Sequence, residues 1–320
     1  MSRLLAFLGG HATWVLFVGV FLGLALPSLS TLARPLLAPA VAVLLTATLV
    51  RIDWRFMLNH LRRPWSAAVI IIWLLIGAPL ATAGVLALLP LPTSLTTALV
   101  LMAAAPPILS AAPIAMMLGL DGALALVVGL IATLLTPLTV PPLALALLGL
   151  ELDIGITEFM VRLAVVVAIA LAAALVIRRA IGRERLPRLS RHLDGLVVVV
   201  MLVFAVAIMD GVTATLAERP TTVALWLLAA FVANPALQIA GALAFAWLGQ
   251  RRALTVGLVS GNCNMGLLLA AFPPDTDTDV VLYFAVAQLP MYMLPALLLP
   301  LYRRLVTPEP DSDSPSIRTG

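Results

Sequence analysis

The pattern of hydrophobic and polar residues along the chain is that of a protein with many membrane spans. Long apolar runs alternate with short polar connections, and a helix needs about 20 apolar residues to cross a bilayer core about 30 Å thick. We therefore predict an all-α polytopic membrane protein with ten transmembrane helices. We expect these helices at about 11–33, 35–51, 65–90, 94–119, 122–149, 155–177, 195–213, 220–248, 253–272 and 279–302.

The connections between the spans suggest how the chain is organised. Residues 1–177 hold the first six expected spans, 178–195 form a basic cytoplasmic connection, 195–306 hold spans seven to ten, and 307–320 are expected to be a disordered cytoplasmic tail. Ten spans make two sets of five, and an odd number reverses the orientation of the second set. The sequence thus predicts an inverted repeat of five plus five.

The fourth and ninth spans are interrupted at corresponding places in the two sets. The fourth carries Pro106, Pro107 and Pro113, and the ninth reads "TVGLVSGNCNMGLLLAAF" over 255–272, with Gly266 after its polar residues. Each proline removes a helical amide donor and clashes with the preceding turn. Paired interruptions of this kind mark the binding site in transporters built from inverted repeats. We predict that helices four and nine are broken and cross each other.

The polar residues within the spans are candidates for contact with a solute or an ion. Asn262 and Asn264 favour this role, because their amides stand in a segment expected to be unwound. Asn234, Gln238 and Gln288 are equally explained as interhelical hydrogen-bonding groups. Ser110, Thr133 and Thr136 lean towards bonds with their own helix carbonyls. The candidate substrate- or ion-binding residues are Asn262, Asn264, Ser260, Gly261, Cys263, Asn234, Gln238, Gln288, Ser110, Thr133 and Thr136.

Composition and charge support the membrane assignment and give it an orientation. Hydrophobic residues make up 62% of the chain and charged residues 11%, whereas soluble domains carry about 25% charged residues. Fifteen of the arginines fall on one side of the expected topology, which places both termini in the cytoplasm and the protein in a plasma membrane of the bacterial inner type. The basic residues are thus topology determinants beside the lipid bilayer, and we expect no nucleic-acid partner.

The titratable residues argue against an enzyme. Charged side chains avoid the span centres, Glu158 and Arg162 are four residues apart near the end of the sixth span, and Asp210 lies towards the end of the seventh. We interpret these residues as interfacial pairing or capping groups, and Asp121 as a solvated residue or an N-cap. A lone cysteine and no nucleophile beside a base predict neither catalysis nor a cofactor.

Several stretches together resemble the bile acid:sodium symporter family. "SGNCNMGLLLAAF" resembles the ninth-span motif of that family, and "RIDWRFMLNHLRRPW" is similar to the connection before its third span. "GAPL" resembles part of the third span, "APPILSAAPIAMMLGLDGALALVVGLIATLLTPLTVPPL" the fourth and fifth, and "YFAVAQLPMYMLPALLLPLYRR" the last. The resemblance covers spans two to five and eight to ten.

The resemblance implies a panel of spans 1, 2, 6 and 7 and a core of spans 3–5 and 8–10, with sodium driving uptake of an organic anion. The chain departs from the family at its sodium ligands. Val259 replaces an acidic residue and Cys263 a glutamine, a serine–asparagine pair aligns with Ala111 and Ala112, and a glutamine aligns with Leu74. Thr133, Thr136 and backbone carbonyls are what remains, so any Na⁺ site is expected to be weak.

Two functions from different classes follow. The first is a secondary active transporter of a small organic anion that works by alternating access, with its coupling ion open between Na⁺, H⁺ and none. The second is a membrane sensor or receptor that keeps the fold without transport. The related arsenite efflux permeases depend on a thiol in the fourth span, which has none here.

Overall fold

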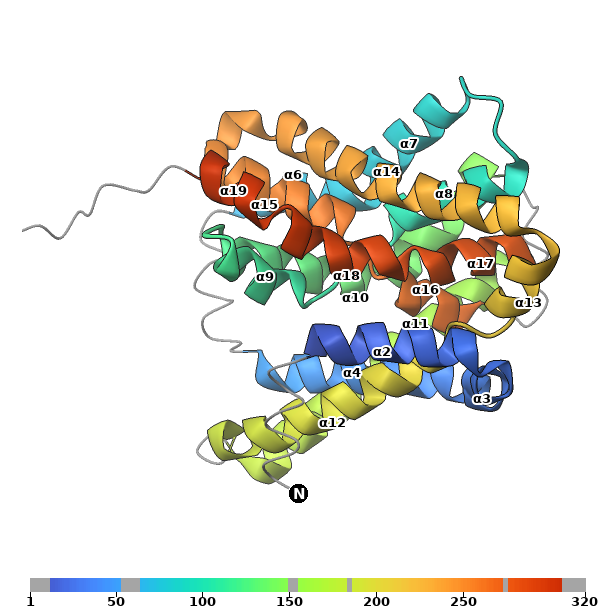
Figure 1. Cartoon of the computed structure of the whole chain (residues 1–320). Helices are drawn as coiled ribbons and strands as arrows, with labels where there is room; N and C mark the ends of the chain where they lie inside the picture. Colours follow the sequence, from blue (N-terminus) through green and yellow to red (C-terminus); the bar gives the residue numbers. More distant parts are fainter. Residues whose placement is uncertain (1–11, 53–63, 149–154, 183–185, 273–275, 307–320) are drawn as a thin grey trace, which may run out of the picture.

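The protein is almost entirely helical in the computed structural model, which describes residues 12–52, 64–148, 155–182, 186–272 and 276–306 (Figure 1). Within these ranges seven helices are long and apolar enough to cross a membrane. Their outward-facing residues include many large exposed hydrophobic side chains, such as Leu32, Leu228 and Leu243. Such side chains suit contact with lipid rather than water, so the predicted polytopic all-α membrane class is confirmed.

One group of helices forms a layer along one side of the molecule, which we call the first bundle. It contains α2 (Ala12–Ala25), α3 (Pro27–Ala33), a short 3₁₀ turn (Arg34–Leu36), α4 (Leu37–Arg51), α11 (Ile156–Ile181) and α12 (Leu186–Ala207). Helix α12 packs against α2, α3 and α4, while α11 packs against α4. In Figure 1 α2, α3, α4 and α12 lie below the remaining helices.

The remaining helices form a second bundle. Its first part is α6 (Pro64–Ile72), a π-helical turn (Trp73–Gly77), α7 (Ala78–Leu86), α8 (Thr93–Ala104), α9 (Ala111–Met117) and α10 (Gly122–Leu148). Its second part is α14 (Pro220–Ala244), a 3₁₀ turn (Ala246–Leu248), α15 (Gln250–Gly261), α16 (Met265–Ala271), α17 (Thr278–Val286), α18 (Gln288–Leu297) and α19 (Leu299–Leu305). The short α13 (Val212–Glu218) connects the two bundles.

Helices α14 and α15 pack closely because glycines line their contact. A Cβ on Gly257 would stand 2.5 Å from the carbonyl oxygen of Gln238, and one on Gly261 would stand 2.6 Å from that of Asn234. Small residues four apart let membrane helices approach at backbone distance. This contact holds α15 in place up to the point where it ends.

Three of the ten expected spans contain no single long helix in the described residues. The first is divided at Leu26 between α2 and α3, the fourth is α8 followed by α9, and the ninth is α15 followed by α16. The other seven expected spans each correspond to one of the seven long apolar stretches.

The helices extend into one of the expected connections. The connection predicted at 178–195 is helical over most of its length, since α11 continues to Ile181 and α12 begins at Leu186. Helical hydrogen bonding continues past the apolar run because arginine is itself a good helix former. The predicted disordered tail at 307–320 lies outside the described residues.

The charged residues form contacts at both ends of the helices. At one end, Arg178 donates to the carbonyl oxygens of Val50 and Ile52, both at 2.6 Å, and so caps α4. At the other end, Arg219 makes two hydrogen bonds to Asp279, and this carboxylate raises the pKa of the guanidinium above its ordinary value.

The remaining charged contacts agree with the interfacial roles predicted from sequence. Asp121 accepts from the amide of Leu124 at the start of α10 and is the expected helix cap. The predicted pair of Glu158 and Arg162 also forms.

Candidate functional site

The two interruptions pair with each other in the middle of the second bundle. The amide of Ile108 donates to the carbonyl oxygen of Asn262 at 2.9 Å, and the amide of Asn264 donates to the carbonyl oxygen of Pro106 at 2.6 Å. Pro107 and Cys263 stand opposite each other in this short antiparallel bridge. Two backbone segments far apart in sequence thus satisfy each other's polar groups where both have left the helix. We call this pairing the crossover.

The prolines explain why the fourth span breaks at this point. Ala105 ends α8 in an extended conformation, as expected for a residue before proline. Pro107 has no amide hydrogen and occupies the position in the bridge that needs none, because Pro106 and Ile108 make the hydrogen bonds. Pro113 does not take part in the break. It lies in the first turn of α9, where a missing amide leaves no helical bond unmade.

A chain of buried side chains fixes the break in the ninth span. Tyr302 donates to Gln238 Oε1 at 2.6 Å, Gln238 Nε2 donates to Asn234 Oδ1 at 2.6 Å, and Asn234 Nδ2 donates to the carbonyl oxygen of Gly261 at 2.8 Å. Gly261 is the last residue of α15. The chain therefore supplies a partner to a carbonyl near the end of the helix, where helical partners run out. Asn234 and Gln238 here serve as hydrogen-bonding groups between helices.

The two asparagines of the ninth span have different environments. Asn264 is half-buried and caps α16, with its Oδ1 accepting from the amide of Leu267 at 3.2 Å. Asn262 is fully buried, and its Nδ2 donates to the carbonyl oxygen of Leu258 at 2.8 Å. Its Oδ1 is the one buried side-chain oxygen or nitrogen in the described part of the chain without a hydrogen-bond partner. A buried acceptor in this state is uncommon and points to a role beyond packing.

A cavity of about 160 Å³ lies at the crossover, between the two bundles. Three of the candidate binding residues line it, namely Ser110, Asn264 and Gln288, together with Gly266 from the expected break. Val41, Leu45 and Phe204 line it from α4 and α12. We call it the crossover cavity. A Cβ on Gly266 would stand 3.1 Å from Phe204 Cζ, so the glycine permits the two bundles to approach closely beside the cavity.

The other proposed residues are enclosed by protein. Thr133 and Thr136 each donate to the carbonyl four residues earlier at 2.8 Å. Threonines in membrane helices commonly make this bond within their own helix. Ser260 donates to Val256 and accepts from Trp73 Nε1 at 3.1 Å. Cys263 is buried and contacts the carbonyl of Ser260. None of these lines the crossover cavity.

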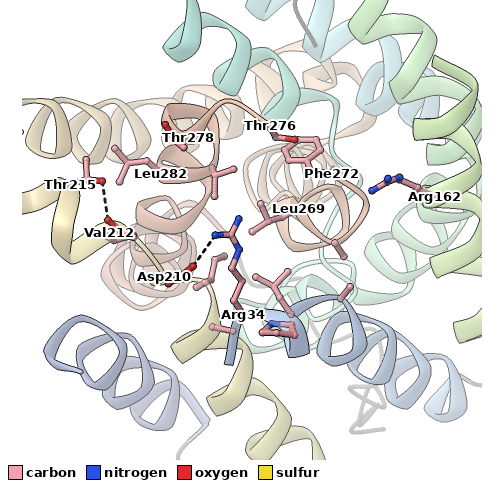
Figure 2. Close-up of a pocket in the computed structure, with 18 residues that line it drawn as sticks. Arg34, Arg162, Asp210, Val212, Thr215, Leu269, Phe272, Thr276, Thr278 and Leu282 are labelled. Atoms are coloured by element: carbon pink, nitrogen blue, oxygen red, sulfur yellow. Dashed lines mark hydrogen bonds and ion pairs between the residues drawn. The ribbon is translucent and has the colours of Figure 1, made fainter. Parts of the chain in front are cut away.

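A second and larger cavity, about 550 Å³, lies further along the same interface (Figure 2). Arg34, Arg162 and Asp210 line it from the first bundle, and Leu269 and Phe272 line it from the second. We call it the basic cavity. The sequence indicated interfacial roles for Arg162 and Asp210, but it did not indicate this cavity. The available signal was Arg162, an arginine placed inside an apolar span.

The two cavities are lined by successive turns of the same helices. On α4 the basic cavity is lined by Leu37 and Ala38, and the crossover cavity by Val41 and Leu44. On α16 the corresponding residues are Leu269 and Gly266. The cavities therefore follow each other along one interface between the bundles.

The positions that align with sodium ligands in the resembling family carry residues that do not form a cation site. Leu74, Ala111, Ala112 and Val259 belong to a single buried hydrophobic cluster. Apolar side chains offer no oxygen to a cation, and the hydroxyls of Thr133 and Thr136 are directed at helix carbonyls. The residues present do not fit the Na⁺ site of that family.

Comparison with known proteins adds no assignment: no protein-family model matches the chain, and no curated protein matches it. The geometry of the crossover and of the two cavities is therefore the basis for a functional proposal.

Proposed function

We propose that the protein is a secondary active transporter of a small organic anion, with its substrate site at the crossover cavity. The observation that carries the proposal is the pairing of residues 106–108 with 262–264, two unwound segments beside a cavity between two bundles. Transporters built from inverted repeats place their sites at such broken helices, because irregular backbone at membrane depth persists only where it is buried or lines a cavity.

The position of the two breaks supports an inverted repeat with ten spans. They fall in the fourth and ninth spans, which correspond when the chain is divided into five plus five, and their backbones run antiparallel. Two repeats of opposite orientation would bring their breaks together in this way. The first and second bundles then correspond to the panel and the core of the resembling family.

Alternating access would use the interface between the bundles. The crossover cavity has walls from α4 and α12 on one side and from the crossover on the other. A relative movement of the bundles would therefore change the access to Ser110, Asn264 and Gln288. The clustering of Arg51, Arg178 and the arginines in the last turn of α19 at one end supports a cytoplasmic assignment for that end.

The test is uptake of organic anions into proteoliposomes. A screen of monocarboxylates and sulfonates by thermal shift identifies a ligand, because binding to the folded state alone raises the apparent stability. Uptake of that ligand is then measured with Asn264→Asp and Asn264→Ser. Aspartate and serine both keep an oxygen that caps α16, so the fold is retained in each variant.

The two variants separate a carrier from a receptor. In a carrier, Asn264→Asp places a negative charge against the anion and abolishes uptake, while Asn264→Ser reduces it. Ligand binding that saturates in the wild type without any uptake would instead indicate the receptor that keeps the fold without transport.

A further inference from the structure

The turn between α9 and α10 lies between the start of α15 and the end of α19. The amide of Asp121 in this turn donates to Thr255 Oγ1 of α15 at 3.0 Å. A Cβ on Gly119 would stand 3.5 Å from Cγ1 of Val306, the residue that ends α19. Figure 1 shows α9, α15 and α19 at the same end of the second bundle. The first turn of α15 and the last turn of α19 therefore belong to one surface.

Three exposed arginines stand on this surface, and their charges are little compensated. Arg303 and Arg304 in the last turn of α19 are exposed, and neither forms an ion pair in the part of the chain that the structure describes. Arg252 at the start of α15 has Asp121 as its ion-pair partner at 3.9 Å, with side chains 42% and 29% exposed. An exposed pair at this distance contributes little. We call Arg252, Arg303 and Arg304 with their surroundings the arginine surface.

Large apolar side chains are exposed beside the arginines. Met116 and Met117 at the end of α9 are 63% and 76% exposed, and Leu305 of α19 is also exposed. Trp247, in the turn that precedes α15, is exposed and stacks on Phe245. Exposed tryptophans near arginines are typical of the interface between a bilayer and water. The arginine surface therefore suits the level of the lipid head groups.

This combination of side chains favours an anionic phospholipid as the partner. Guanidinium groups bind phosphate through paired N–H donors, and acyl chains can cover the two methionines of α9. A soluble polyanion would leave those methionines and Trp247 in water, which is unfavourable for apolar surface. Basic pockets between membrane helices on the cytoplasmic side are known to bind anionic head groups.

The arginine surface is connected to the crossover by hydrogen bonds between buried side chains. Tyr302, the residue before Arg303, is buried and donates to Gln238, the first member of the chain that ends at the carbonyl of Gly261. Gly261 precedes Asn262, whose carbonyl oxygen accepts a hydrogen bond in the crossover. A ligand that holds the last turn of α19 in place would thus also hold Tyr302 and the broken end of α15.

We propose that the arginine surface binds the head group of an anionic phospholipid, with the phosphate on Arg252, Arg303 and Arg304 and the acyl chains beside the exposed methionines of α9. The bound lipid steadies α19 and, through Tyr302, the end of α15 at the crossover. The site lies outside both cavities, and it does not depend on whether the protein is a carrier or a receptor.

The first test follows thermal unfolding of the purified full chain in a neutral detergent. The added probes are dihexanoyl phosphatidylglycerol, dihexanoyl phosphatidylcholine and glycerol phosphate. The two lipids share their acyl chains and differ in net charge, whereas glycerol phosphate has the charge without the chains. We expect phosphatidylglycerol to raise the melting temperature in a saturable way, because it binds the folded state. The other two probes should have little effect.

Substitutions show whether the arginines carry this binding. Arg303→Gln and Arg304→Gln should each weaken phosphatidylglycerol binding by about fivefold, the contribution of one arginine beside anionic lipid. Arg179→Gln, at an exposed position in the last turn of α11 in the first bundle, also removes one positive charge and should leave the binding unchanged. Equal shifts with phosphatidylcholine or glycerol phosphate, or unchanged binding in both α19 variants, would overturn the inference.

The connection to the crossover is tested with Cys263, the one cysteine of the chain. It is buried opposite Pro107, so a maleimide reaches it when this region opens. We expect phosphatidylglycerol to slow the modification in the wild type. In Tyr302→Phe the lipid should still bind, by the same thermal titration, without slowing it. Equal protection of Cys263 in Tyr302→Phe would refute the connection through Tyr302.

Discussion

The amide of Asn264 donates a hydrogen bond of 2.6 Å to the carbonyl oxygen of Pro106, which joins the two broken helices at the level of their backbones. Main-chain groups make this contact, so substitution of the side chains leaves the donor and acceptor in place. The pairing at the crossover is therefore set by where the two helices break, and not by contacts between the side chains of the two segments.

At Asn262 one substitution is expected to abolish uptake without lowering the stability of the protein. Leucine has the branching of asparagine without its polar atoms, and the carbonyl of Leu258 keeps the amide of Asn262 as a donor at 3.1 Å. Asn262→Leu removes the unpaired Oδ1, which as a buried acceptor costs about 1–3 kcal/mol. We expect an unchanged or higher melting temperature together with a loss of uptake, both measured on the same preparation.

A variant of Asn262 that melts at a markedly lower temperature would contradict this expectation. It would mean that the amide makes a structural contact outside the hydrogen bonds described above. Asn234→Leu is the comparison, because both polar ends of Asn234 are bonded. It should lower the melting temperature clearly.

Two buried tyrosines offer a matched test of the hydrogen-bonded side chains that lead from Tyr302 to Gly261. Tyr302 donates to an amide oxygen at 2.6 Å, whereas Tyr283 donates to the sulfur of Met102, a weak acceptor. Tyr302→Phe leaves Gln238 Oε1 buried without its donor and should cost about 1–3 kcal/mol. Tyr283→Phe should cost less than about 1 kcal/mol, as judged by thermal unfolding in the same detergent.

Substitution of glycine by alanine is expected to lower the stability of the protein at Gly261 and to raise it at Gly84. A Cβ on Gly261 would meet Gln238 Cγ at 2.5 Å and the backbone oxygen of Asn234 at 2.6 Å. Overpacking of this kind typically costs about 1–3 kcal/mol. A Cβ on Gly84 in α7 meets nothing within 4 Å, so Gly84→Ala should stabilise the protein by about 0.5–1 kcal/mol. Unfolding temperatures of the two variants give the comparison.

Uptake is expected to be independent of sodium. Leu74, Ala111, Ala112 and Val259 pack together as a hydrophobic cluster where the resembling family has cation ligands. Replacement of external sodium by choline at constant pH and ionic strength should therefore leave the uptake rate unchanged. A rate that rises with sodium concentration in a saturable way would show that backbone carbonyls and the two threonines suffice for a site.

The sequence predicted where the helices break, but it did not predict which charged residues share a cavity. Two consecutive prolines remove two backbone amide donors from a helix whatever surrounds it. Pro106 and Pro107 therefore indicate the interruption from the local sequence alone. Arg34 and Arg162 come from distant parts of the chain and share a cavity through tertiary packing. No local pattern contains that information.

The roles of the polar residues were predicted unevenly for the same reason. Thr133 and Thr136 bond their own helix, as their local context indicates. Gln238 depends on Tyr302, a residue on the last helix, for its second hydrogen bond. Sequence spacing placed Asn234 and Gln238 on one helical face but could not identify that partner.

The glycine at position 266 has a mechanical consequence for the surface where the bundles meet. Phe204 of α12 rests against bare backbone there, with 3.1 Å between its ring and the place a methyl group would occupy. Interlocked side chains oppose the sliding of one helix along another. An aromatic ring packed on the backbone of a glycine has no side chain to pass and opposes such sliding less. A relative movement of the two bundles, as the proposed transport cycle requires, would therefore not have to separate interlocked side chains at this contact.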